Sequence, residues 1–116
     1  KSLVKKSLET VFVDQSLITE ERITRYHELL LAEGNRRAAL SIFKNKFDQQ
    51  TNRIKDIQQP TLILFGEKDQ LINSDNAYLF QKDIKNSKVV ILKNIGHVPM
   101  EEAPKATADL INDFIQ

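Results

Sequence analysis

Hydrophobic residues in the first half of the chain recur every three to four positions, which is the period of an amphipathic helix. A short helix is predicted over residues 3–13. Thr19 is a good N-cap for a second helix, because Glu20 and Glu21 follow it in the first turn, where carboxylates complement the helix dipole. Gly34 supplies a stop for this helix. Its apolar positions are Ile23, Tyr26, Leu30 and Leu31.

A third helical pattern begins directly after the second. Asn35 can cap it, and polar residues over positions 48–52 loosen the pattern at its far end. The apolar stripe expected on this helix consists of Ala39, Leu40, Ile42, Phe43 and Phe47. Residues 1–53 are therefore expected to form a helical segment.

The pattern changes at Pro60, where short continuous apolar runs replace the helical period. Residues 61–65 and 89–92 are such runs, and their length and β-branching predict strands that are buried on both faces. Ser74 or Asp75 can cap a helix between them, and Pro104 suits the first turn of a last helix. The residues expected to face inward are Ala77, Phe80 and Ile84 on the first of these helices and Thr107, Leu110, Ile111, Phe114 and Ile115 on the second.

Two strands separated by one helix indicate a parallel βαβ unit with a right-handed crossover. Residues 54–116 are therefore predicted to have an α/β fold of order strand, helix, strand, helix. The length of 116 residues suits one compact unit.

Composition and charge argue against several classes of binding partner and site. The net charge of +1 is too small to indicate a nucleic-acid partner, and no apolar run approaches the roughly 20 residues that span a bilayer. The absence of cysteine excludes thiol nucleophiles and disulfides, and together with the lack of a signal peptide it leads us to expect a cytoplasmic protein. Because the chain begins at Lys1 within a helical pattern, we expect it to be a segment of a longer protein.

Two loops carry candidate chemistry. Asp69 closes the loop that begins at Gly66 after the first strand, and His97 follows Gly96 in the loop after the second strand. Catalytic groups of open parallel sheets gather outside the carboxyl ends of the strands, so these side chains can meet. A carboxylate on one imidazole nitrogen fixes the tautomer and leaves the other nitrogen free to accept a proton from a nucleophile or water.

These loops resemble the C-terminal part of α/β-hydrolase-fold enzymes. Residues 57–69 resemble the segment that ends in the triad acid, and residues 96–104 match the histidine pattern G-H-x-P-x-x-E-x-P. The resemblance implies that Asp69 is the triad acid and His97 the general base. It also implies a structural or capping role for Glu102 and Pro104 at the start of the last helix. The helices before residue 54 are similar to the cap that such enzymes insert.

The nucleophile expected in this family is not found. Its order is nucleophile, acid, histidine, with the nucleophile in a glycine-flanked elbow, and this chain has glycine at positions 34, 66 and 96 alone. We therefore expect the chain by itself to be inactive. We also expect it to self-associate, because the outer edge of the first strand has no obvious partner.

Two functions remain open from the sequence. The first is a fragment of an esterase-like hydrolase whose parent protein acts on a small ester-like substrate. The second is a non-catalytic binding or scaffold protein that retains part of the fold. No cofactor is expected, since no glycine-rich phosphate loop follows either strand, and no metal is expected, since His27 and His97 lie far apart without convergent carboxylates. His27 is assigned to a cap surface or to a partly buried position rather than to catalysis.

Overall fold

The computed structural model describes residues 1–44 and 50–116. Two short 3-10 turns, Gln15–Leu17 and Thr51–Asp56, connect the regular elements. The helices and strands, in chain order, are α1 (Ser2–Val11), α2 (Glu20–Leu31), α3 (Asn35–Lys44), β1 (Thr61–Gly66), α4 (Asn76–Asp83), β2 (Ser87–Leu92), α5 (Pro99–Glu102) and α6 (Pro104–Ile115).

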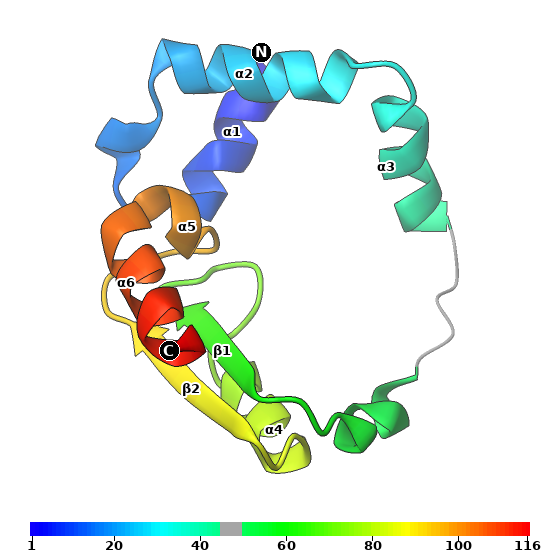
Figure 1. Ribbon diagram of the computed structural model, residues 1–116. Helices are drawn as coiled ribbons and strands as arrows, with labels where there is room; N and C mark the ends of the chain where they lie inside the picture. The colour runs from blue at the N-terminus through cyan, green and yellow to red at the C-terminus, as the bar shows by residue number, and fades with distance from the viewer. Residues whose placement is uncertain (45–49) are drawn as a thin grey trace.

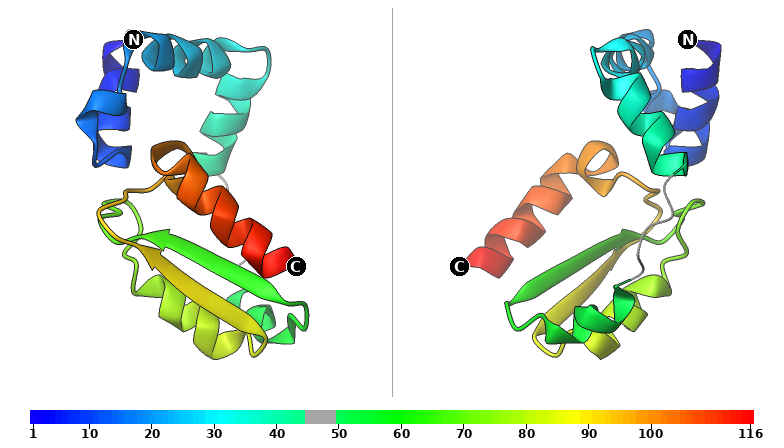
Figure 2. Two further views of the ribbon diagram at one scale, coloured as in Figure 1. Left: turned by 60° about the vertical axis from the view of Figure 1, so that its left-hand side comes forward. Right: turned by 90° about the vertical axis from the view of Figure 1, so that its right-hand side faces the viewer.

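The sheet of the described residues has two parallel strands, β1 and β2, as the sequence predicts. Their register pairs Thr61 with Ser87 at one end and Gly66 with Leu92 at the other. Helix α4 lies on one face of the sheet and α6 on the other (Figure 2). Because this register aligns the two carboxyl ends, the loops after β1 and β2 leave the sheet side by side.

Helices α1 and α2 pack against each other around a small apolar core. Leu8, Phe12 and Ile23 form its buried centre. The Arg22 guanidinium lies over the Phe12 ring, 4.8 Å from its centroid, which adds a cation–π contact. The hydroxyl of Thr19 accepts a hydrogen bond from the Arg22 N–H, so the predicted N-cap of α2 is confirmed.

Several expected details of the helices are wrong. Asn35 is the first residue of α3, and its side chain donates to the Leu29 carbonyl at 2.6 Å rather than capping α3. Helix α2 ends at Leu31, and Gly34 lies beyond it with a φ of +82° in the turn to α3. By contrast, Pro104 does stand in the first turn of the last helix, as expected, after a break at Ala103, because the residue before a proline is disfavoured in the helical region.

Parts of the expected apolar stripes lie on the surface of this chain. Leu40 and Ile42 of α3 are more than half exposed, as is Ile115 of α6. Phe80 and Ile111 are also exposed, because no described element covers these faces, whereas Ala77, Ile84 and Thr107 are buried as expected. The expected stripe position Phe47 lies outside the described residues.

The chain is more open than a compact protein of its size. Its accessible surface is 8860 Å², whereas a compact monomer of this mass exposes about 6500 Å². Its radius of gyration is 16.3 Å, against about 13 Å for a compact chain of this length. Helices α1–α3 stand away from the far end of the sheet (Figure 1), and Leu29, Leu40 and Ile42 on these helices are more than half exposed. Among the described helices, none has the length and apolarity needed to cross a membrane.

Candidate active site

The loops after β1 and β2 are joined by backbone hydrogen bonds. The Glu67 N–H donates to the Leu92 carbonyl and the Lys68 N–H donates to the Ile95 carbonyl, both at 2.9 Å. The Glu67 carboxylate in turn accepts the Asn94 N–H at 3.0 Å. These contacts hold the two loops in one fixed arrangement at the carboxyl edge of the sheet.

Both motif glycines are required by close backbone approach. A Cβ atom at Gly66 would lie 2.0 Å from the Gly96 carbonyl oxygen and 2.3 Å from that of Ile95. A Cβ atom at Gly96 would lie 2.3 Å from the Val11 carbonyl oxygen, at the end of α1. The histidine loop is therefore packed between the end of β1 and the end of α1, with no room for a side chain at either position.

Asp69 and His97 meet as the sequence predicts. Asp69 Oδ2 lies 2.9 Å from His97 Nδ1, and the two side chains are 4% and 32% exposed. The other carboxylate oxygen, Oδ1, accepts the N–H groups of Leu71 at 2.8 Å and Ile72 at 2.9 Å. Residues 70–73 contain no proline, so both N–H groups are present to orient the carboxylate.

The environment of Asp69 favours its ionised form. Burial, the largest single effect, acts to raise the pKa of Asp69, but the hydrogen bonds from Ile72, His97 and Leu71 together outweigh it and leave the pKa below its usual range. An ionised carboxylate can only accept at Oδ2, so a neutral His97 carries its proton on Nδ1. Its Nε2 is then a free acceptor, which is the form that a general base needs.

The backbone of His97 is held by contacts from outside its own loop. The His97 N–H donates to the Val11 carbonyl at 2.9 Å. The Gly96 N–H donates to Glu102 Oε2 at 2.8 Å, and Glu102 Oε1 accepts the N–H groups of Val13 at 2.9 Å and Asp14 at 2.8 Å. The Glu102 carboxylate thus joins the histidine loop to the segment after α1.

The expected role of Glu102 is corrected in part. Glu102 is the last residue of α5, and α6 has no side-chain cap, so Glu102 does not open that helix. Pro104 does stand at the first position of α6. Sequence reasoning missed the contacts of Glu102 with Val13 and Asp14 because these residues lie 89 and 88 residues away, beyond the reach of any local pattern.

Glu101 provides a second connection between α5 and the N-terminal part of the chain, in this case to α2. Its carboxylate accepts a hydrogen bond from the Tyr26 hydroxyl at 2.7 Å and pairs with Arg25 at 3.2 Å and Arg22 at 3.5 Å. Burial and the contact with Glu101 raise the pKa of Tyr26. All three partners are side chains of one helix, in contrast to the backbone partners of Glu102.

An apolar cavity of about 610 Å³ opens beside His97. Helices α1 and α2 supply most of its wall, and His97 and Val98 supply the part nearest the loop. The residues that line it are Leu3, Val4, Ser7, Leu8, Val11, Tyr26, Leu29, Leu30, Asn35, Ala39, His97 and Val98. An apolar group held in this cavity would lie next to the imidazole.

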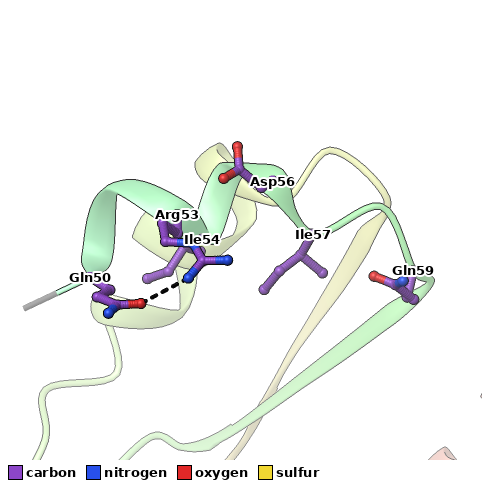
Figure 3. Close-up of a pocket in the computed structure, with 6 residues that line it drawn as sticks. All are labelled: Gln50, Arg53, Ile54, Asp56, Ile57 and Gln59. Carbon is purple, nitrogen blue, oxygen red and sulfur yellow. Dashed lines mark hydrogen bonds between the residues drawn. The ribbon is translucent and has the colours of Figure 1, made fainter.

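A second cavity, of about 380 Å³, lies at the opposite end of β1. It is lined by Gln50, Arg53, Ile54, Asp56, Ile57 and Gln59, and Arg53 donates to the Gln50 side chain at 3.0 Å (Figure 3). These residues precede β1, so the cavity is remote from the Asp69–His97 pair. His27, half-buried in α2, lines neither cavity, and the described residues contain no group of three or more possible metal ligands.

Comparisons with known proteins identify the family to which the chain belongs. A protein-family model described as alpha/beta hydrolase fold matches residues 3–104. The chain is 34% identical over 90 residues to monoacylglycerol lipase ABHD6 of Mus musculus, and this match covers 78% of the chain and 24% of the lipase. It is 30% identical over 109 residues to Lipase 1 of Psychrobacter immobilis, covering 94% of the chain and 31% of that lipase. A match to the uncharacterized hydrolase YugF of Bacillus subtilis, 30% identical, covers all of the chain and 43% of YugF.

Solved structures show the same fold. The meta-cleavage product hydrolase CumD of Pseudomonas fluorescens superimposes with a TM-score of 0.81 at 21% identity, over 97% of the chain and 44% of CumD. A membrane phospholipase A superimposes with a TM-score of 0.78 at 27% identity, over 97% of the chain and 36% of that protein. The chain therefore spans less than half the length of the relatives that it matches. The match of the family model across most of the sequence establishes that the chain belongs to the α/β-hydrolase fold family.

Proposed function

We propose that this chain supplies the acid and the base of a catalytic triad to a carboxylic-ester hydrolase, with Asp69 as the acid and His97 as the general base. The observation that carries the proposal is the 2.9 Å contact between Asp69 Oδ2 and His97 Nδ1 at the carboxyl ends of paired parallel strands. We further propose that residues 1–53 act as a cap over the reacting centre, since α1 and α2 line the cavity beside His97.

The chemistry follows from the protonation states of the pair. His97 Nε2 would take the proton of a nucleophilic hydroxyl as it attacks the ester carbonyl, and would then deliver it to the leaving alcohol. Asp69 would hold the imidazole in the required tautomer and stabilise the imidazolium between these steps. The lowered pKa of Asp69 supports this role, because the carboxylate stays ionised throughout.

The substrate class is supported by the wall of the cavity. Apart from His97 and a few polar side chains, the residues that face it are aliphatic or aromatic. Such a wall favours an ester whose acyl or alkyl part is apolar, since burial of that part releases water from both surfaces. The similarity to proteins named monoacylglycerol lipase and Lipase 1 points to the same class.

The nucleophile would come from outside these 116 residues. The sequence contains no G-x-S-x-G, so we propose that a nucleophile elbow and an oxyanion hole are contributed by residues that precede Lys1 in a longer protein. The chain alone would then be inactive. A binding or scaffold protein that keeps this half of the fold is the competing proposal, because nothing in the sequence itself supplies the attacking group.

The test measures hydrolysis of p-nitrophenyl butyrate by the 116-residue chain and by the longest reading frame that contains it. We expect no turnover above buffer for the former. We expect turnover for the latter that falls about 10⁶-fold in the His97→Ala variant. A longer protein that lacks ester hydrolysis, or one whose activity survives His97→Ala, would refute the hydrolase proposal and favour the scaffold.

A further inference from the structure

Glu102 receives hydrogen bonds from three backbone N–H groups in two segments that are far apart in sequence. Gly96 donates from the histidine loop, and Val13 and Asp14 donate from the segment after α1. We propose that Glu102 is a positioning residue for His97, which acts by fixing the histidine loop to the end of α1. This inference rests on the proposed role of His97 as a base and adds a further residue to that machinery.

On the side of α1, two consecutive backbone N–H groups of the loop, those of Gly96 and His97, make hydrogen bonds. Gly96 has no side chain, and the loop begins with Asn94 in the left-handed region at a φ of 56°. The Gly96 N–H points to Glu102 and the next one, of His97, points to the Val11 carbonyl. Without the Glu102 carboxylate, the N–H groups of Gly96, Val13 and Asp14 would all lose their acceptor.

Glu101 and Glu102 are neighbours with different tasks. Glu101 contacts the side chains of Arg22, Arg25 and Tyr26, which can rearrange without moving the main chain. Glu102 contacts main-chain groups, one of them adjacent to His97 itself, so its loss shifts the backbone that carries the imidazole. The pair therefore offers a matched control, because both acids join α5 to the N-terminal helices but only Glu102 holds the histidine loop.

The position of Glu102 also relates His97 to the cavity. Val11 ends α1 and lines the cavity, and its carbonyl accepts the His97 N–H. Glu102 accepts the N–H groups of Val13 and Asp14, which follow Val11 closely in the same segment. This short segment thus forms part of the substrate wall and part of the support of the base.

The experiment compares Glu102→Gln with Glu101→Gln in the full 116-residue chain by NMR. The Glu102→Gln change keeps the size of the side chain but puts an NH₂ group where an acceptor is needed. We expect the His97 Nδ1–H resonance to broaden or vanish in Glu102→Gln and to persist in Glu101→Gln. In the longer hydrolase, Glu102→Gln should lower kcat about 10²-fold, the effect of displacing a catalytic group by about 1 Å, with KM changed less than about threefold.

Retention of the wild-type Nδ1–H resonance in Glu102→Gln would overturn the proposal. If that variant does not fold, hydrogen exchange of the unmodified chain decides instead. The amides of Gly96, Val13 and Asp14 should exchange at least about tenfold more slowly than exposed loop amides, and unprotected exchange would again overturn the proposal. Loss of the resonance in Glu102→Gln, with no ester hydrolysis by the longer protein, would refute the proposed function and leave the positioning role intact.

Discussion

Replacement of Asp69 by asparagine tests the centre of the site. The amide oxygen of the introduced side chain can still accept the N–H groups of Leu71 and Ile72, but its nitrogen would face His97 Nδ1. A hydrogen bond to a charged group is worth about 1 kcal/mol more than its neutral counterpart. The bonds from Leu71 and Ile72 would each lose this difference, and part of the loss is offset because a neutral amide costs less to bury than a carboxylate. The free energy of unfolding should therefore fall by about 1–2 kcal/mol, which corresponds to a decrease of about 4–8 °C in Tm.

The loss of stability in Asp69→Asn should be larger at neutral pH than at acid pH. The folded-state pKa of Asp69 lies below its unfolded value, which is near 3.9. Its ionised form therefore stabilises the chain above that pH, and this stabilisation is lost as the pH falls through the folded-state pKa. The difference in Tm between wild type and Asp69→Asn should be full at pH 7 and should shrink below about pH 4.

Imidazole ¹⁵N NMR tests the Asp69–His97 contact more directly than thermal unfolding does, because it reports which nitrogen of His97 carries the proton. The wild-type chain should show the proton of neutral His97 on Nδ1, and Asp69→Asn should move it to Nε2, because the new NH₂ group can only donate. Asp75→Asn is the matched control, since Asp75 is exposed in the same loop region and makes no cap hydrogen bond. An unchanged tautomer in Asp69→Asn would refute the assignment of the pair.

Three further predictions concern stability and association. Gly66→Ala should destabilise the chain by about 3 kcal/mol or more, because the new Cβ atom would clash with backbone atoms. Gly34→Ala has open space around it and should cost only about 1–2 kcal/mol, because its backbone is left-handed. Equal losses of stability in thermal unfolding would contradict the packing argument. Phe12→Ala should cost about 3–5 kcal/mol, since Phe12 is 1% exposed, and a loss near that of an exposed residue such as Leu3→Ala would count against this core. Light scattering should give a mass above that of the monomer that rises with concentration, and a constant monomeric mass at high concentration would rule out association through the open edge of β1.

The part of the fold that depends on local pattern was predictable from the sequence. Thr19 lies before two glutamates and caps α2, and the apolar runs at residues 61–65 and 89–92 form the parallel strands. The meeting of Asp69 and His97 could also be predicted, because parallel strands bring their carboxyl ends to one edge whatever the side chains are.

The contacts of Glu102 with the segment after α1 were not predictable. The partners of Glu102 are backbone N–H groups, which every residue except proline offers, so no residue type marks them in the sequence. The exposure of Phe80 and Leu40 was missed for a different reason. Periodicity identifies an apolar face but does not say whether an element of the same chain covers it.

The open shape of the chain has a consequence for how sharply it unfolds. An unfolded chain of this mass exposes about 19,000 Å², so a compact fold would bury about 13,000 Å². With 8860 Å² still exposed, this chain buries about four fifths of that amount. Because the urea m-value and the heat-capacity change both scale with the area exposed on unfolding, each should be about four fifths of the value usual for this length, and the denaturant transition should be correspondingly broad.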